Sequence, residues 1–300
     1  MRRRHLLALL GLPSAPGAGA ADAAADSRPG RIERLNLASR HVAERPVDVW
    51  LPPGYRADRP HAVLYMHDGQ MLFDPARTWN RQAWQVDAVV APLIAAGTLR
   101  DFIVVGIWNT GAARAAEYFP QGFVPHVAAP LRERLLQERL QNRPRADAYL
   151  RFLVEELKPQ VDVRYATAPG RASTFLMGSS MGGLISCYGL CEYPQVFGGA
   201  ACLSTHWIGL FERNDAIPAA ALAYLRTRLP APDTVKLYMD RGDTELDALY
   251  DTAQARVDAL MAERGFGAPG FVSQVFAGHG HNETDWSRRL ALPLQFLLGV

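Results

Sequence analysis

The chain has 300 residues, of which 49% are hydrophobic and 21% are charged. This balance excludes a disordered protein, which could not bury enough apolar surface to offset its chain entropy, and it excludes a coiled coil, which needs more charge at helical spacing. The 32 basic and 30 acidic residues give a formal net charge of +2, too balanced to favour nucleic acid as the main partner. No internal stretch approaches the ~18 consecutive apolar residues of a membrane span.

Residues 1–20 have the three-part form of a secretory signal. Three arginines at positions 2–4 are followed by a short apolar block, and Ala18-Gly19-Ala20 is the small-residue pattern that precedes a cleavage site. The paired arginines also resemble a twin-arginine signal, so the export route stays open. We therefore expect an exported protein, periplasmic or secreted, with a linker over residues 21–30 and one folded domain over residues 31–300.

Short apolar runs of strand length recur along the chain, separated by amphipathic segments. A continuous apolar run is typical of a strand that is buried on both faces. In one of the intervening segments, Asp147 is expected to cap a helix that ends at Pro159. The alternation predicts an α/β domain with a mainly parallel central sheet and helices on both faces. The apolar runs cover residues 61–66, 101–107, 174–177, 199–203, 235–239 and 271–276.

Residues 109–145 interrupt this alternation. The segment contains Arg114 and a charged stretch over 131–140, whose leucines could form one apolar edge. An insertion of this size after a central strand either covers an active site as a lid or forms a solvated surface helix, and the sequence leaves both open.

Three cysteines are an odd number, so at least one is unpaired within the chain. Cys187 and Cys191 lie one helical turn apart, which is poor geometry for a disulfide inside a helix. We expect all three cysteines to be small core residues, although a bridge from either of these two to Cys202 stays open for an exported protein. Their spacing does not indicate a zinc site, and we expect no metal.

One motif carries nucleophile chemistry. Gly178-Ser-Ser-Met-Gly182 follows an apolar run and precedes a helix-like segment, which is the strand–turn–helix context of a G-x-S-x-G elbow with Ser180 as the nucleophile. We expect the flanking glycines because side chains at those positions would collide with neighbouring strands. The start of the following helix directs backbone N–H groups toward developing negative charge.

A serine nucleophile needs a base, and the base needs an acid that orients it. The expected chain order is serine, acid, histidine. His279 and His281 both follow the last strand-like run, and spacing favours neither. Four acids crowd after the run at 235–239; we rank Glu245 first, then Asp247, with Asp243 and Asp240 behind them.

Two backbone N–H groups should form an oxyanion hole. One should belong to Met181, directly after the nucleophile, and the other to Gln70, in the segment after the run at 61–66, where Gly69 allows close approach. His206 and Trp207 follow another strand-like run and are expected either to line the substrate cleft or simply to pack.

Several segments together resemble the putative-esterase branch of the α/β-hydrolases, from about Pro46 to the carboxyl terminus. The matching segments are 48–55, 63–74, 106–109, 155–159, 178–183 and 281–286. In that family the histidine stands before Ser/Asn-Glu, which implies His281 rather than His279. The family often has Gly-Thr-x-Glu after its seventh strand; this chain has Gly242-Asp-Thr-Glu245, followed by Leu246-Asp247, so the acid stays open.

The resemblance implies the α/β-hydrolase fold and a serine carboxylic ester hydrolase that forms an acyl-enzyme. It implies a small-molecule or carbohydrate-linked ester as substrate, and no metal or organic cofactor. An acyltransferase that uses the same triad is the alternative, and a binding module without catalysis on the same scaffold is a second one.

Overall fold

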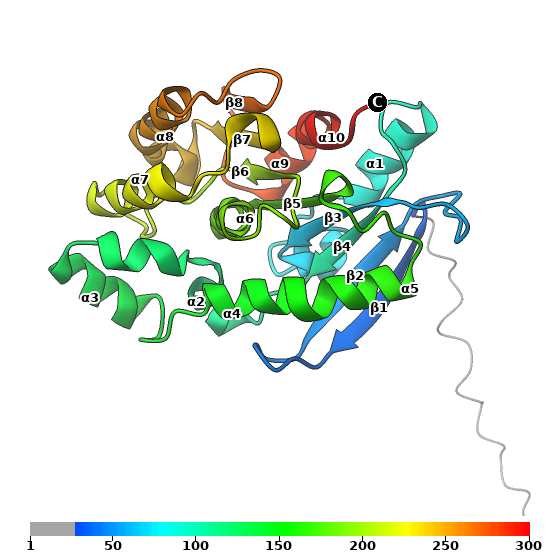
Figure 1. Ribbon diagram of the computed structural model, residues 1–300, viewed down its shortest axis with the longest axis horizontal. Helices are drawn as coiled ribbons and strands as arrows, with labels where there is room; N and C mark the ends of the chain where they lie inside the picture. The colour runs from blue at the N-terminus through cyan, green and yellow to red at the C-terminus, as the bar shows by residue number, and fades with distance from the viewer. Residues whose placement is uncertain (1–27) are drawn as a thin grey trace, which may run out of the picture.

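The computed structural model describes residues 28–300, so the predicted signal at 1–20 and most of the predicted linker lie outside the described residues. Eight strands form one sheet in the order β1-β2-β4-β3-β5-β6-β7-β8 (Figure 1). β2 is antiparallel to both of its neighbours, and all other pairs are parallel, which confirms the mainly parallel sheet. The strands are β1 (Arg31–Leu37), β2 (Arg45–Leu51), β3 (Ala62–His67), β4 (Phe102–Ile107), β5 (Thr174–Ser179), β6 (Gly199–Leu203), β7 (Lys236–Gly242) and β8 (Phe271–Phe276).

Helices cover both faces of the sheet, as expected (Figure 1). One face packs against α4 to α8, and the other against α1, α9 and α10. The helices are α1 (Val86–Ala95), α2 (Arg114–Tyr118), α3 (Ala129–Glu138), α4 (Ala146–Arg151), α5 (Lys158–Arg164), α6 (Met181–Glu192), α7 (Ala216–Arg228), α8 (Asp251–Glu263), α9 (Glu283–Arg289) and α10 (Ala291–Leu298).

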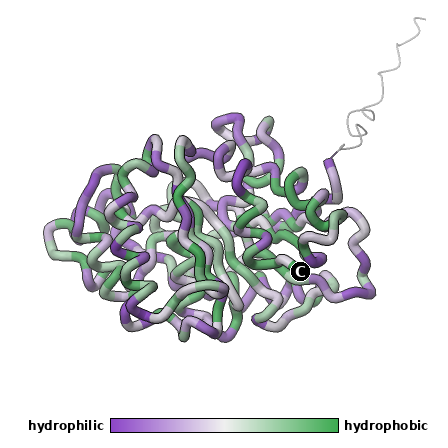
Figure 2. The backbone as a smooth tube through the Cα atoms, turned by 90° about the horizontal axis from the view of Figure 1, so that it is seen from above, coloured by the Kyte–Doolittle hydropathy of each residue, from purple (hydrophilic) through white to green (hydrophobic). Residues whose placement is uncertain are grey.

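The apolar runs form strands because alternate side chains enter two separate hydrophobic clusters. In β3, Val63 and Tyr65 lie in the cluster beneath α4 to α8, whereas Leu64 and Met66 lie in the cluster beneath α1 and α10. Figure 2 shows these central strands as a hydrophobic centre within a more hydrophilic periphery. β8 is the exception: it is one of the two edge strands, and Val275 is 56% exposed, so its apolar run is not buried on both faces.

The helix that was expected to end at Pro159 continues through it. α4 passes into a π-helical turn over Phe152–Leu157 and then into α5, where Pro159 lies in the first turn. A proline inside a helix removes one backbone hydrogen bond and crowds the preceding turn, and here the π-helical turn lies directly before Pro159. Asp147 lies inside the first turn of α4, and its Oδ1 accepts a hydrogen bond from the Tyr188 hydroxyl at 2.7 Å, so Asp147 is not the cap.

The insertion at 109–145 folds into α2, the 3₁₀ helix η4 (Gln121–His126) and α3, and η4 packs against α7. Leu135 and Leu140 are fully buried, which confirms an apolar edge. The insertion is also fixed to the sheet by charge: Arg45 in β2 makes two 2.8 Å hydrogen bonds to Glu117 in α2, and both side chains are fully buried.

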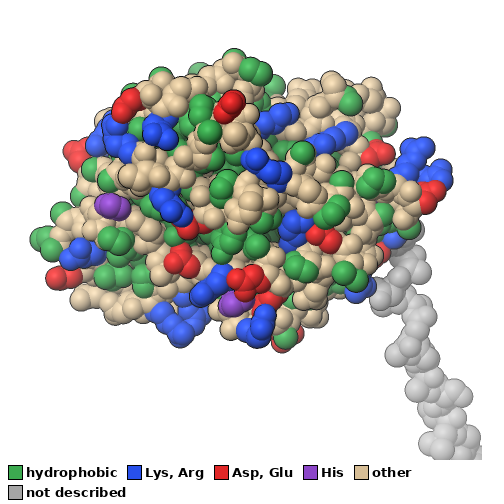
Figure 3. All heavy atoms as spheres, viewed as in Figure 1, with side chains coloured by type: hydrophobic (Ala, Val, Ile, Leu, Met, Phe, Trp, Pro, Cys, Tyr) green, Lys and Arg blue, Asp and Glu red, His purple; other side chains and the backbone are tan. Residues whose placement is uncertain are grey.

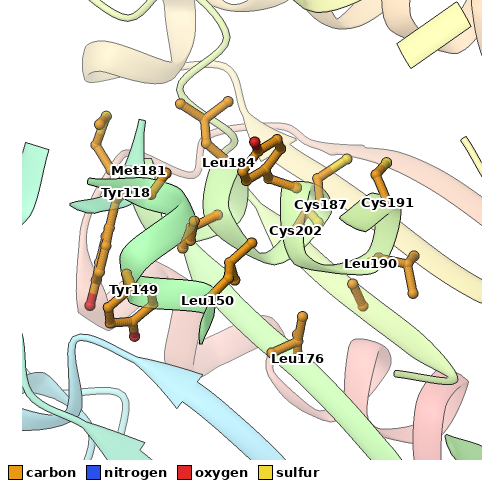
Figure 4. Packing of buried hydrophobic residues seen from close by; sticks show 14 of the residues in the cluster. Tyr118, Tyr149, Leu150, Leu176, Met181, Leu184, Cys187, Leu190, Cys191 and Cys202 are labelled. Carbon is orange, nitrogen blue, oxygen red and sulfur yellow. The ribbon is translucent and has the colours of Figure 1, made fainter. Parts of the chain in front are cut away.

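The three cysteines are free and buried, as predicted for core residues. Figure 4 shows Cys187 and Cys191 on α6 with Cys202 beside them, packed among leucines of α4, β5 and α6. On the face shown in Figure 3, basic and acidic side chains are interspersed rather than separated. Over residues 28–300, no helix combines the length and the apolar character needed to cross a bilayer.

Candidate active site

Ser180 occupies a strained turn between β5 and α6. Its backbone angles are φ 57° and ψ −122°, a region that non-glycine residues rarely adopt. Hydrogen bonds to neighbouring segments hold the turn: Ser180 N donates to Leu203 O at 2.9 Å, and Ser180 O accepts from His206 N at 3.2 Å. The side chain therefore sits at the carboxyl edge of the parallel strands, and the residue is partly exposed.

Two of the glycines around Ser180, Gly178 and Gly183, lie too close to neighbouring atoms to carry a side chain. A Cβ on Gly178 would lie 2.7 Å from the carbonyl carbon of Gly182, and one on Gly183 would lie 2.9 Å from Thr205 Oγ1. The sequence predicted that a side chain at Gly178 would collide with a neighbouring strand; in the structure it would collide with the start of α6 instead. A Cβ on Gly182 would make only ordinary contacts, of which the shortest is 3.4 Å to His67 Cβ at the end of β3.

His281 is held by Asp247. The imidazole Nδ1 lies 2.6 Å from Asp247 Oδ1, and the second carboxylate oxygen, Oδ2, accepts from Ser204 Oγ and from Gly242 N, each at 2.6 Å. Asp247 is fully buried. Burial raises the pKa of Asp247, but its hydrogen bonds, first among them the bond to His281, outweigh burial and hold the pKa below its ordinary value.

The side chain of Glu245, which the sequence ranked first as the acid, contacts the backbone of the histidine loop rather than the imidazole. Its Oε2 accepts from His281 N at 2.8 Å and lies 3.3 Å from Asn282 Nδ2. Glu245 is exposed, has φ 53° and begins the 3₁₀ helix η8 (Glu245–Leu249). This turn sends the Asp247 side chain two residues later into the interior, where the imidazole lies, so the ranking of Glu245 over Asp247 does not agree with the geometry.

The remaining sequence candidates support the same loop or the core. Asp243 Oδ1 accepts from Gly278 N at 2.7 Å, and the His279 carbonyl accepts from Asp243 N at 3.0 Å. Asp240 is buried and paired with Arg289 at 3.1 Å. Burial raises the pKa of Asp240 to about 6, although Arg289 opposes this shift. Neither Asp243 nor Asp240 therefore contacts the His281 imidazole, which is paired with Asp247. His279 contacts this loop through its carbonyl oxygen.

Tyr250, which the sequence did not single out, joins Ser180 to two histidines. Burial, followed by the charge of Asp247, raises the pKa of its phenol well above the ordinary value, and the neighbouring Ser180 side chain opposes that rise. The same hydroxyl lies 2.6 Å from His206 Nδ1, and the Tyr250 ring packs edge-on against the His281 ring at 5.7 Å. Ser180 and His281 are thus brought to the same side of the molecule, around one tyrosine at the start of α8.

His206 and Trp207 are both 1% exposed. Trp207 Nε1 donates to Gln254 Oε1 at 2.8 Å, so its indole packs in the core rather than lining a cleft. His206 lies beside Ser180 through its backbone, and burial, the larger cause, together with the charge of His281 lowers its pKa to about 3. A neutral, buried His206 is a partner for the Tyr250 hydroxyl, not an exposed surface for substrate.

The loop after β3 lies against the start of α6, close to the elbow. Met181 is the first residue of α6, and Gln70 lies in the 3₁₀ helix η1 (Gly69–Met71) directly after β3. Gln70 Oε1 accepts from Asn109 N at 3.2 Å, which fixes this turn to the end of β4. Both N–H groups predicted for the oxyanion hole therefore belong to segments beside the Ser180 turn.

An ionic cluster that the sequence did not reveal joins the loops after β3 and β4 to the insertion. Asp68 accepts two 2.7 Å hydrogen bonds from Arg114 and one of 2.7 Å from Asn109 Nδ2. Burial raises the pKa of Asp68, but Arg114 and Asn109 lower it below the ordinary value. The signal in the sequence was that Asp68 and Asn109 each follow the end of a neighbouring parallel strand.

The insertion also reaches the site. The Arg139 guanidinium lies 4.6 Å from the Phe211 ring centroid, and the Phe211 ring lies 5.8 Å from the His206 ring. Phe211 is 66% exposed, so a large aromatic surface stands open beside the buried histidine. This arrangement favours the interpretation of the insertion as a cover over the site. Among residues 28–300, no group of three or more His, Cys, Asp or Glu side chains is arranged to hold a metal ion.

Comparison with known proteins identifies the family of the chain. A protein family described as "Putative esterase" matches residues 39–296. The chain belongs to this family. By family it is a carboxylic ester hydrolase, and its sheet with helices on both faces is the α/β-hydrolase fold that the sequence predicted.

Individual relatives are distant. The chain is 22% identical over 273 residues to YbbA of Bacillus subtilis, which is described as uncharacterised. The alignment covers 88% of this chain and 96% of YbbA. The chain is 25% identical over 289 residues to an endo-1,4-β-xylanase/feruloyl esterase of Xylanibacter ruminicola, covering 91% of this chain and 32% of the relative. Among solved structures, an IroE-like serine hydrolase from Shewanella oneidensis superposes with a TM-score of 0.68 at 19% identity, over 89% of this chain and 80% of that chain.

Proposed function

We propose that this esterase hydrolyses carboxylic esters with Ser180 as nucleophile, His281 as general base and Asp247 as the acid that orients the imidazole. The observation that carries the proposal is the meeting of the strained Ser180 elbow and the Asp247-bound His281 around Tyr250. Nucleophile, base and orienting acid converging on one edge of a sheet is the arrangement required for acyl transfer through an activated serine.

The hydrogen bond to Asp247 determines the protonation of the imidazole. With Nδ1–H donated to the carboxylate, Nε2 carries the free lone pair that accepts the Ser180 proton as its oxygen attacks the ester carbonyl. The same Nε2–H then protonates the leaving alcohol, and water activated in the same way cleaves the acyl-enzyme to release the acid. The N–H groups of Met181 and Gln70 are the proposed donors to the oxyanion.

The substrate class we propose is a small-molecule or carbohydrate-linked ester. The exposed Phe211 ring beside Arg139 offers a stacking surface near the nucleophile. A relative whose name includes feruloyl esterase makes feruloyl arabinose a first natural probe, next to simple acyl esters.

The test is Ser180→Ala assayed on a p-nitrophenyl short-chain ester. We expect kcat to fall about 10⁴-fold or more, because the nucleophile is lost, and we expect a fluorophosphonate probe to label the parent but not the variant. Ser273→Ala, a serine on the edge strand β8, is the matched control and should retain activity and labelling. Parent-like turnover by Ser180→Ala would disprove the assignment.

We also propose that the protein is exported, on the basis of the charged, apolar and small-residue order of residues 1–20. Expression of the full chain in a bacterial host, followed by fractionation and amino-terminal sequencing, tests this. We expect periplasmic protein that begins close to Ala21; an unprocessed amino terminus in the cytoplasmic fraction would contradict export.

A further inference from the structure

A second cleft lies at the edge of the sheet opposite Ser180. It has a volume of about 1070 Å³, near the upper end of the ~300–1,000 Å³ typical of small-molecule sites. Ser180 follows the carboxyl end of β5, whereas this cleft is built where β4, β5, β7 and β8 begin. It is therefore separate from the proposed active site.

Three cations from distant parts of the chain line the cleft. Arg100 precedes β4, Arg171 precedes β5 and Lys236 begins β7, while the acid in the lining is the exposed Asp233. Within the part of the chain that the structure describes, none of the three cations has a carboxylate within ion-pair distance. Burial, and for Lys236 also the nearby Arg100, lowers the pKa of Arg100 and of Lys236. Such unpaired, partly desolvated cations favour an anion.

Each cation is positioned by a hydrogen bond to the wall. Arg100 Nη2 donates to Ala172 O at 3.0 Å, Arg171 Nη2 to Thr234 O at 2.6 Å, and Lys236 Nζ to Phe296 O at 3.0 Å. The Nε atoms of Arg100 and Arg171 are buried and have no hydrogen-bond partner among the described residues. The three side chains are thus held in place by the wall, and two of their donors, the Nε atoms of Arg100 and Arg171, have no partner within residues 28–300.

Much of the remaining lining is apolar. The Arg100 guanidinium lies 5.2 Å from the Phe175 ring centroid, and Lys236 Nζ lies 6.0 Å from that of Phe296. Pro232, Val235 and Leu297 extend this surface. A ligand that satisfies both the cations and the apolar wall must carry a negative head and a hydrophobic body.

We propose that this cleft binds an organic carboxylate with an apolar chain or ring, its carboxylate between Arg100 and Lys236 and its body against Phe175 and Phe296. Charge-assisted hydrogen bonds to the carboxylate supply orientation, and burial of the apolar body supplies affinity. The proposal does not depend on the chemistry at Ser180, because the two sites share no residue.

Isothermal titration of the full folded chain with octanoate tests the proposal, with octan-1-ol as the uncharged probe. We expect saturable octanoate binding and at least tenfold weaker binding of octan-1-ol, because the alcohol cannot pair with the cations. The double variant R100Q/K236Q should weaken octanoate binding tenfold or more. Arg164→Gln, an exposed arginine on α5, is the matched control and should bind like the parent.

Two further variants keep the test decisive. Ala172→Trp keeps all three cations but fills part of the cleft, so it should also weaken binding even if the double variant unfolds; thermal melting checks the fold of each. Arg139→Gln, near Ser180, should leave octanoate binding unchanged. Absence of saturable binding in the millimolar range, equal binding of octan-1-ol, or loss of binding in Arg139→Gln but not in the cleft variants would overturn the proposal.

Discussion

His281 Nδ1 and Asp247 Oδ1 lie 2.6 Å apart, and the carboxylate is fully buried while the imidazole keeps 13% of its side-chain surface exposed. The carboxylate is thus shielded from water, whereas the imidazole keeps contact with solvent. Ser204 Oγ and Gly242 N fix the second oxygen of Asp247, so the carboxylate cannot rotate away from the ring.

Asp247→Asn should lower kcat by about 10⁴-fold, because an amide at this position favours the wrong imidazole tautomer while leaving the geometry in place. Glu245→Gln, which changes an exposed carboxylate on the same turn, should lower kcat less than tenfold. Steady-state kinetics on a p-nitrophenyl ester compares the two. If Glu245→Gln is the more damaging substitution, Asp247 is not the triad acid.

Gly69→Ala tests the position of the loop that carries Gln70. A Cβ at Gly69 would lie 2.5 Å from the carbonyl carbon and oxygen of Gly106 in β4, so the loop must shift away from the sheet. Misplacement of an oxyanion donor by about 1 Å is expected to cost about 10²-fold in kcat. Gly170→Ala is the control, since a Cβ there meets nothing within 4 Å. Equal kcat in both variants would argue against a role for this loop.

Glu117→Gln tests the attachment of the insertion to β2. Removing the charge leaves the fully buried Arg45 guanidinium without its counter-ion, and we expect the free energy of unfolding to fall by about 3–5 kcal/mol. Glu138→Gln breaks the exposed pair with Arg134 and should leave the free energy of unfolding nearly unchanged. Urea unfolding measures both, and similar losses for the two variants would contradict a structural role for the buried pair.

His67 should make the protein less stable in acid. Burial lowers the pKa of His67 from 6.5 to about 4, so below pH 6.5 the unfolded chain takes up the proton before the folded one does. The contribution of neutral His67 to the free energy of unfolding is fully present above pH 6.5 and is lost as the pH falls toward 4. At about pH 5 this amounts to a loss of about 2 kcal/mol, which His67→Gln should abolish.

Urea unfolding at neutral pH and at about pH 5 measures this difference for the parent, for His67→Gln and for His126→Gln, an exposed histidine. The number of protons taken up on unfolding, given by the slope of the unfolding free energy against pH, should fall by about one in His67→Gln and should not change in His126→Gln. An unchanged dependence in that variant would show that His67 is protonated in the folded state.

The strands and the turn at Ser180 follow from local sequence. Continuous apolar runs predict buried strands because both faces of a parallel sheet are covered. Gly178 predicts the tight turn because a side chain at that position would collide with the backbone of Gly182. The rule for apolar runs fails at β8, since a strand at the sheet edge has one neighbour fewer, a fact that its own residues do not encode.

Contacts between distant parts of the chain determine the partner of His281, the direction of Trp207 and the grouping of the cleft cations. Glu245 and Asp247 are two residues apart in one turn, and which of them meets the imidazole depends on the positive φ at Glu245 and on the place of His281, supplied by another loop. Trp207 faces inward because Gln254 on α8 accepts its N–H. The cations of the second cleft are far apart in the chain and become neighbours only when four strands begin at the same edge of the sheet. Residue type and spacing set the local structure, whereas the direction of each side chain is determined by partners that the chain brings together only on folding.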